Sequence, residues 1–123
     1  MAEINSSQSV RTGGKNVFEV IHADLTGGRE LDMTGVTTEY DANDGYIPEG
    51  TPIILDGADY KPLLEANKGS GADGPKVIGF LVAEVHKDKP FAAVGIQGVI
   101  NEAKLPFVLD ATSKTAVPAI SFI

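Results

Sequence analysis

Short apolar runs closed off by glycine and proline constrain this chain more than any other sequence feature. Residues 47–57 read Ile-Pro-Glu-Gly-Thr-Pro-Ile-Ile-Leu-Asp-Gly, so a brief apolar run lies between turn-forming residues. Similar runs recur at 77–83, 92–100 and 119–123. Apolar runs this short between turn signals are typical of buried strands, because a helix would need about 10–12 residues. The chain is therefore expected to form a small, mainly β fold.

The expected strands can be placed by their apolar and β-branched residues. They lie at 16–22, 34–38, 53–55, 62–64, 77–85 and 91–100, with 34–38 as a possible edge strand and 77–85 as the central strand. Gly27 and Gly28 are expected to form the turn that follows this first strand. Gly95 and Gly98 indicate bulges or close backbone approach within the last of these strands. Asn101 and Asp110 are each expected to begin one short helical turn.

Length and composition favour a single domain with many turns. The chain has 123 residues, with 14 Gly and 7 Pro, and it has no Cys, which excludes disulfides and Cys-based zinc sites. Its formal net charge of -7 argues against general binding to nucleic acid, because the phosphate backbone would be repelled. No stretch approaches the roughly 20 apolar residues of a membrane span, and the N-terminus is polar. We therefore expect a protein made in soluble form in the cytoplasm, with no membrane partner.

The N-terminal segment differs in composition from the rest of the chain. Residues 1–14 are rich in Ser, Asn, Gln, Thr and Gly, and such a segment buries too little apolar area to offset its ordering entropy. We expect residues 1–16 to form a flexible arm and residues 17–123 to form one β-rich domain. The arm is either a frayed terminus or a segment that becomes ordered on a partner.

Acidic residues are concentrated between residues 24 and 44, where Arg29 is the single cation. This region is either an acidic surface loop or a docking surface for a basic partner. Within it, residues 41–45 read Asp-Ala-Asn-Asp-Gly, but the spacing does not match a calcium loop, so a turn is expected.

The sequence offers little catalytic or cofactor chemistry. Gly69, Gly71 and Gly74 match the spacing of a dinucleotide-binding loop, but Pro75 and an expected strand follow where that motif needs a helix. His22 and His86 have no convincing ligand partners at helical spacing. No serine stands in a Gly-x-Ser-x-Gly motif. We therefore assign no catalytic, cofactor-binding or metal-binding residue, and we expect the protein not to be an enzyme.

Four of the apolar segments also occur in a recognisable order. These are 51–56, 77–83, 98–106 with its final Leu-Pro, and the apolar end at 119–123. In this order and spacing they resemble the head decoration proteins of tailed bacteriophages, the family of the phage lambda capsid-stabilising protein. The resemblance covers residues 47–123, whereas the first 46 residues match poorly.

The resemblance implies a fold, a partner and a place of action. It implies a β-clip-like fold, a bent ribbon of short strands that closes into a partial small barrel. It also implies a homotrimer that binds the major capsid protein at the three-fold and quasi-three-fold positions of the expanded head. There the protein would stabilise the shell against internal DNA pressure, from the outer surface of the virion.

A segment that leads from the polar arm into the first strand is the expected capsid contact, because an arm can add a strand to a sheet of its partner. The residues expected to contact the capsid are Ala2, Glu3, Ile4, Asn5, Ser6, Arg11, Lys15, Val17, Phe18, Val20 and Ile21. Two other functions stay open at this point. One is an accessory module of a phage tail or fibre, and the other is a β domain that binds or hydrolyses a small ligand.

Overall fold

A computed structural model describes residues 17–34, 36, 38–64 and 76–123. In this part the fold is mainly β, as predicted, with short strands, 3-10 turns and a single short α-helix. The strands are β1 (Phe18–Asp24), β2 (Arg29–Glu30), β3 (Tyr46–Ile47), β4 (Pro52–Asp56), β5 (Asp59–Pro62), β6 (Val77–Leu81), β7 (Val85–His86), β8 (Phe91–Ala92), β9 (Val94–Ile100) and β10 (Ile120–Phe122). The helical elements are η1 (Asp41–Asn43), η3 (Glu102–Lys104) and α1 (Ala111–Thr115).

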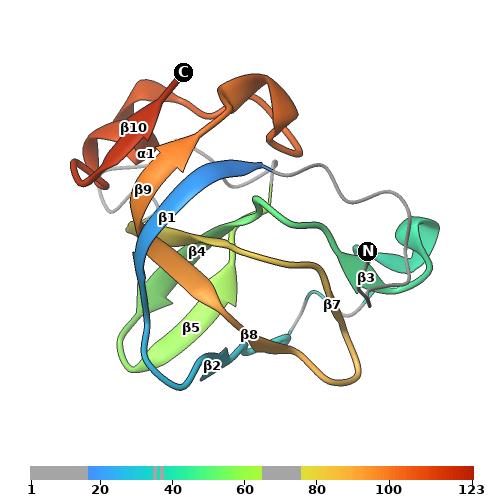
Figure 1. The fold of residues 1–123 in the computed structure, drawn as a ribbon. Helices are drawn as coiled ribbons and strands as arrows, with labels where there is room; N and C mark the ends of the chain where they lie inside the picture. Colours follow the sequence, from blue (N-terminus) through green and yellow to red (C-terminus); the bar gives the residue numbers. More distant parts are fainter. Residues whose placement is uncertain (1–16, 35, 37, 65–75) are drawn as a thin grey trace, which may run out of the picture.

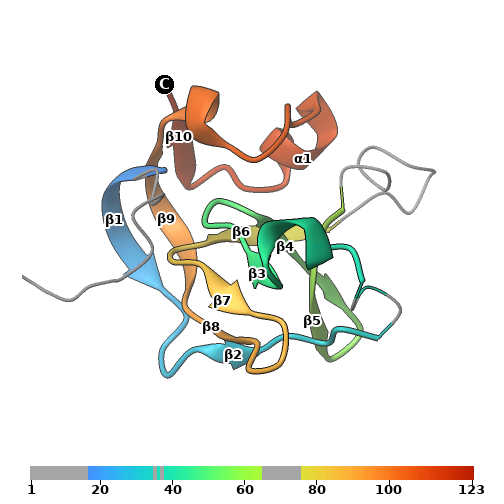
Figure 2. The same cartoon turned by 90° about the vertical axis from the view of Figure 1, so that its right-hand side faces the viewer.

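The largest sheet has the strand order β1-β9-β6-β4-β5, and β10 also pairs with β9. Its pairings are antiparallel except for β10 with β9, which is parallel. Two small ribbons, β2–β8 and β3–β7, complete the described strands. Figures 1 and 2 show β2 and β8 at one end of the molecule and β10 and α1 at the other. Within the described residues the large sheet stays open between β1 and β5 and does not close into a barrel.

Two apolar clusters hold the fold together. Phe80 and Ile100 belong to the first cluster, with Val117 and Ile120 from the C-terminal segment. Leu81 belongs to the second cluster, which lies against other strands. Successive side chains of a strand point to opposite faces, so β6 supplies one fully buried residue to each cluster through Phe80 and Leu81. Burial of a side chain of this size contributes roughly 1.5–3 kcal/mol.

Two of the predicted strands are interrupted in the structure. The expected central strand at 77–85 was predicted too long: β6 ends at Leu81, the chain bends, and β7 then pairs with β3 in a separate ribbon. The expected strand at 91–100 is divided into β8 and β9 by Ala93, whose carbonyl oxygen accepts a 3.0 Å hydrogen bond from the Val82 amide. Both interruptions occur where the chain changes its pairing partner, so distant strands decide them.

Two further strand predictions were wrong in position. Thr34, Val36 and Thr38 lie in turns rather than in an edge strand, and the Val36 amide donates to the Met33 carbonyl oxygen at 3.0 Å. The strand expected at 62–64 lies earlier, as β5 (Asp59–Pro62), because the hairpin after β4 needs only the Gly57–Ala58 turn. The first strand begins at Phe18 and extends to Asp24, two residues beyond its predicted end at 22.

Both predicted helical turns are confirmed. The Asn101 Oδ1 atom accepts a hydrogen bond of 3.2 Å from the Ala103 amide at the start of η3. Asp110 precedes α1, but its carboxylate accepts from the Ser113 hydroxyl at 2.7 Å rather than from a backbone amide. The prediction of close approach in β9 is also confirmed. The β1–β9 register shifts three times, and a Cβ at Gly98 would overlap the Val20 carbonyl oxygen.

Candidate binding surface

The strand β1 lies at the end of the large sheet. Within the described residues, β9 is the only strand that pairs with it, so its other edge faces no strand of that part of the chain. The blue strand in Figure 1 runs along β9 on the outside of the sheet. Its central side chains are exposed, including Val20 at 45% and Ile21 at 44%. An edge strand with exposed β-branched side chains is a template for pairing with another chain.

The residues predicted to contact a capsid fall into two groups. The seven from the arm lie outside the described residues: Ala2, Glu3, Ile4, Asn5, Ser6, Arg11 and Lys15. The other four lie in or next to β1, and of these four only Val20 and Ile21 are exposed. Val17 is fully buried and its carbonyl oxygen accepts a 2.9 Å hydrogen bond from the Asn101 amide. Val17 therefore anchors β1 to the core.

Phe18 is also turned toward the domain, since it is half-buried and packs against the first cluster. A Cβ at Gly95 would overlap the Phe18 ring, so the glycine makes room for this side chain. The surface that β1 offers to a partner therefore begins after Phe18 and is centred on Val20 and Ile21.

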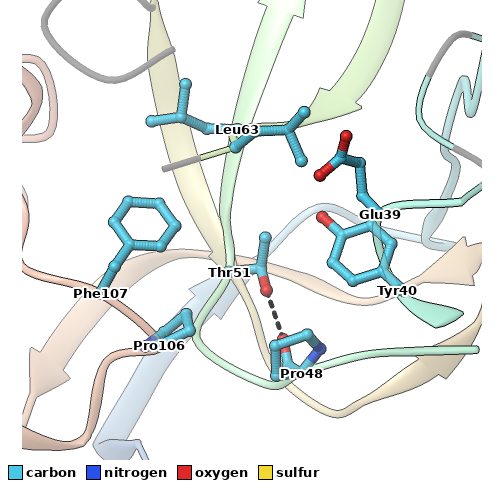
Figure 3. Close-up of a pocket in the computed structure, with 8 residues that line it drawn as sticks. Glu39, Tyr40, Pro48, Thr51, Leu63, Pro106 and Phe107 are labelled. Atoms are coloured by element: carbon cyan, nitrogen blue, oxygen red, sulfur yellow. Dashed lines mark hydrogen bonds between the residues drawn. The ribbon is translucent and has the colours of Figure 1, made fainter. Parts of the chain in front are cut away.

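A separate cavity of about 500 Å³ lies between four segments of the chain. Its lining residues are Glu39, Tyr40, Pro48, Thr51, Leu63, Leu64, Pro106 and Phe107. Figure 3 shows Tyr40 and Glu39 on one side, with Pro106 and Phe107 across from them. The Thr51 hydroxyl donates to the Pro48 carbonyl oxygen at 2.6 Å, so this polar group is already satisfied.

The Tyr40 hydroxyl is electrostatically perturbed. Burial is the main cause that raises the pKa of Tyr40 to about 12, and the negative charge of Glu39 adds to it. The phenol therefore stays protonated at neutral pH. The Glu39 carboxylate lies on the same side of the cavity as this hydroxyl (Figure 3).

The sequence did not predict this cavity. Its walls come from positions that are up to about seventy residues apart, and no local pattern joins them. The nearest signals are the dipeptides Ile47–Pro48 and Leu105–Pro106, which place turns at two of its walls.

A second, more polar groove of about 560 Å³ borders β2 and the β4–β5 hairpin. Its lining includes Glu30, Asp32, Asp59 and Lys87. Asp32 accepts a 2.9 Å hydrogen bond from the Thr34 amide, and hydrogen bonds from Thr34 are the main cause that lowers its pKa. Within the acidic region at 24–44, the Asp32 carboxylate is thus stabilised by hydrogen bonds from the chain itself.

The other sequence motifs form no cluster in the described residues. Asp41 begins η1, as the predicted turn required, and its carboxylate pairs with Lys87. His22 is exposed on β1, whereas His86 packs edge-on against Tyr46 with ring centres 5.0 Å apart. No group of three or more His, Asp or Glu side chains that could hold a metal ion occurs in the described part. The glycine-rich stretch at 69–74 lies outside the described residues.

Comparison of the chain with models of protein families, with curated proteins and with solved structures found no match. Among the residues that the structure describes, no helix is long and apolar enough to cross a membrane.

Proposed function

We propose that this chain is a non-enzymatic head decoration protein of a tailed bacteriophage. It binds the outer surface of the expanded capsid as trimers and stabilises the shell against the pressure of the packaged DNA. The proposal takes its identity from the sequence resemblance over residues 47–123. The structural observation that carries it is the edge strand β1, which exposes Val20 and Ile21 and has one edge that faces no strand of the described chain.

The edge of β1 supports a specific binding mode. A strand of the major capsid protein pairs with this edge, and backbone hydrogen bonds supply much of the affinity. Val20 and Ile21 add apolar contact, because each keeps nearly half of its surface exposed in the isolated domain. Burying the rest of each side chain contributes on the order of 1 kcal/mol. Pairing also covers an edge that would otherwise promote aggregation.

The first test is genetic. Genes for a head protease and a major capsid protein are expected beside the gene for this chain. The neighbouring capsid protein then supplies the probe, which is a set of expanded, DNA-free shells that lack decoration protein. We expect the purified chain to co-sediment with these shells and to raise their resistance to heat. A gene neighbourhood without head genes, or failure to bind such shells, contradicts the proposal.

Substitutions at β1 test the binding mode. Val20→Lys or Ile21→Lys places a charge on the edge and is expected to weaken shell binding at least tenfold, or about 1.4 kcal/mol. Phe91→Lys is the matched control, because Phe91 is 61% exposed and lies on β8 in a separate ribbon. Unfolding in urea should show that all three variants keep the fold. Equal binding by the β1 variants and the control would exclude this edge as the contact.

The arm preceding β1 provides an independent variant. Removing residues 1–16 is expected to weaken shell binding at least tenfold and to leave the unfolding free energy of the domain nearly unchanged. Shell binding as tight as that of the full chain would show that the arm makes no capsid contact.

Binding to expanded shells distinguishes the proposal from a tail or fibre module. Both would form trimers, but a fibre module would not sediment with expanded shells. Trimers are expected in density maps of decorated shells, at the three-fold and quasi-three-fold positions. Monomers on the shell would contradict the proposal, whereas a monomer in solution would be compatible with trimer formation on the capsid.

A further inference from the structure

The cavity lined by Tyr40 and Phe107 combines apolar walls with one charged group. Leu64 and Phe107 provide apolar surface and Tyr40 provides a half-buried aromatic ring, whereas Leu63 lines the cavity but is only 2% exposed. Thr51 adds little polarity, because its hydroxyl is bonded to the Pro48 carbonyl oxygen. The volume of about 500 Å³ lies in the range of cavities that bind small ligands or side chains. The walls are thus suited to an apolar or aliphatic group.

Glu39 is the charged member of the described lining. Its side chain is exposed, and within the described part of the chain its carboxylate has no ion-pair partner. Figure 3 shows this carboxylate on the same side of the cavity as the Tyr40 hydroxyl. Its effect on the Tyr40 pKa agrees with that placement. A ligand in the cavity would therefore meet a negative charge beside an aromatic ring.

We propose that this cavity binds the side chain of an arginine presented by a partner protein. The aliphatic stem of the arginine packs against Leu64, while the guanidinium group pairs with Glu39 and stacks on Tyr40. Arginine fits better than lysine, because its planar guanidinium can bind a carboxylate through two hydrogen bonds and stack on an aromatic ring at once. The net charge of -7 favours the approach of a cationic segment.

The second groove is a weaker candidate for the same ligand. It has more acidic groups, but Lys87 lies among them, and Asp32 already accepts hydrogen bonds from Thr34. Its lining is also less apolar, so it offers less surface to an aliphatic stem. Arginine binding in the cavity does not depend on the proposed capsid function.

A pair of small probes tests the inference on the full chain. N-acetyl-arginine amide and N-acetyl-citrulline amide have nearly the same shape, but only the first is charged. Titration followed by nuclear magnetic resonance should show saturable shifts of Tyr40 and Leu64 with the arginine compound, with a dissociation constant in the millimolar range. The citrulline compound should bind at least fivefold more weakly. Equal affinity for the two compounds, or shifts that do not include the cavity residues, would overturn the inference.

Two matched variants complete the test. Glu39→Gln should weaken binding of the arginine compound at least fivefold and leave the weak binding of the citrulline compound unchanged. Glu30→Gln removes the same charge at the second groove and should leave both affinities as in the unmodified chain. Both substitutions are at exposed positions, so the variants should fold normally. Unchanged binding of the arginine compound by Glu39→Gln would count against the inference. Resonance shifts of the cavity residues that depend on protein concentration alone would also count against it, because they would identify a second copy of the chain as the occupant.

Discussion

Replacing Gly98 by alanine should separate β1 from β9. A Cβ at this position would overlap the Val20 carbonyl oxygen and would lie 3.2 Å from the Ile21 Cα atom. Both are backbone atoms of β1, so a change of side-chain rotamer cannot relieve the contact. The strand must move, and the paired residues around Val20 and Ile21 lose their register with β9.

The magnitude follows from two contributions. Overpacking of a closely packed site costs about 1–3 kcal/mol, and each backbone hydrogen bond that is weakened costs about 1 kcal/mol. We therefore expect Gly98→Ala to lower the free energy of unfolding by about 3 kcal/mol. Gly57→Ala is the matched control, because Gly57 has a φ of +65° but no atom within 4 Å of the added methyl group. Its cost is the left-handed backbone alone, about 1–2 kcal/mol.

Urea unfolding followed by circular dichroism gives the free energy of unfolding of both variants. Equal slopes of this free energy against urea concentration would show that both variants expose a similar surface on unfolding. We expect the loss in free energy of unfolding at Gly98 to exceed the loss at Gly57 by about 1–2 kcal/mol. If the two losses are equal, β1 does not approach β9 as closely as the structure indicates, and the account of the register shifts is wrong.

Three further outcomes can be measured in the same way. The pKa of Tyr40 rises from 10.0 in the unfolded chain to about 12 in the fold. The contribution of protonated Tyr40 to the free energy of unfolding is therefore complete below pH 10 and is lost as the pH approaches 12. Solvent access to the ring limits this contribution to about 1 kcal/mol. In the Tyr40→Phe variant, the free energy of unfolding should no longer fall between pH 10 and pH 12. Ser113→Ala should cost about 1 kcal/mol, since it removes the donor to the Asp110 carboxylate at the start of α1. Phe80→Ala should cost about 3–5 kcal/mol, because the side chain is fully buried in the first cluster.

The sequence predicted the elements that local chemistry determines. Gly27 and Gly28 adopt positive φ angles after β1, and the Asp56–Gly57 signal marks the hairpin between β4 and β5. Asn101 caps η3 through its own side chain. In each case neighbouring residues supply the turn or the cap, so the pattern alone was sufficient to place it.

The errors arose where a distant segment decides the local structure. The run from Val77 to Val85 reads as one mostly apolar strand, but Val85 leaves the large sheet and pairs with β3. Ala93 interrupts the strand expected at 91–100, because β8 and β9 pair with different strands. The short strands β2, β3 and β7 have two residues each, which is too few for any periodic pattern to be recognised.

The candidate site was predicted only in part, because distant segments decide which of its residues are exposed. The apolar residues of β1 are visible in the sequence, but whether each one points to the core or to solvent depends on the register with β9. Val17 proved to be buried, whereas Val20 and Ile21 proved to be exposed. The cavity beside Tyr40 could not be predicted, because its walls meet only in the folded chain.

The two proposed contacts depend on different forces, and ionic strength separates them. Pairing along β1 relies on backbone hydrogen bonds and on the apolar surface of Val20 and Ile21, which salt affects little. The arginine contact relies on the exposed charge of Glu39, whose reach shrinks from about 10 Å at 0.1 M salt to about 3 Å at 1 M. Shell binding should therefore survive high salt, whereas binding of N-acetyl-arginine amide should weaken severalfold. If shell binding falls equally with salt and is also reduced by Glu39→Gln, the capsid is held through the cavity rather than through β1.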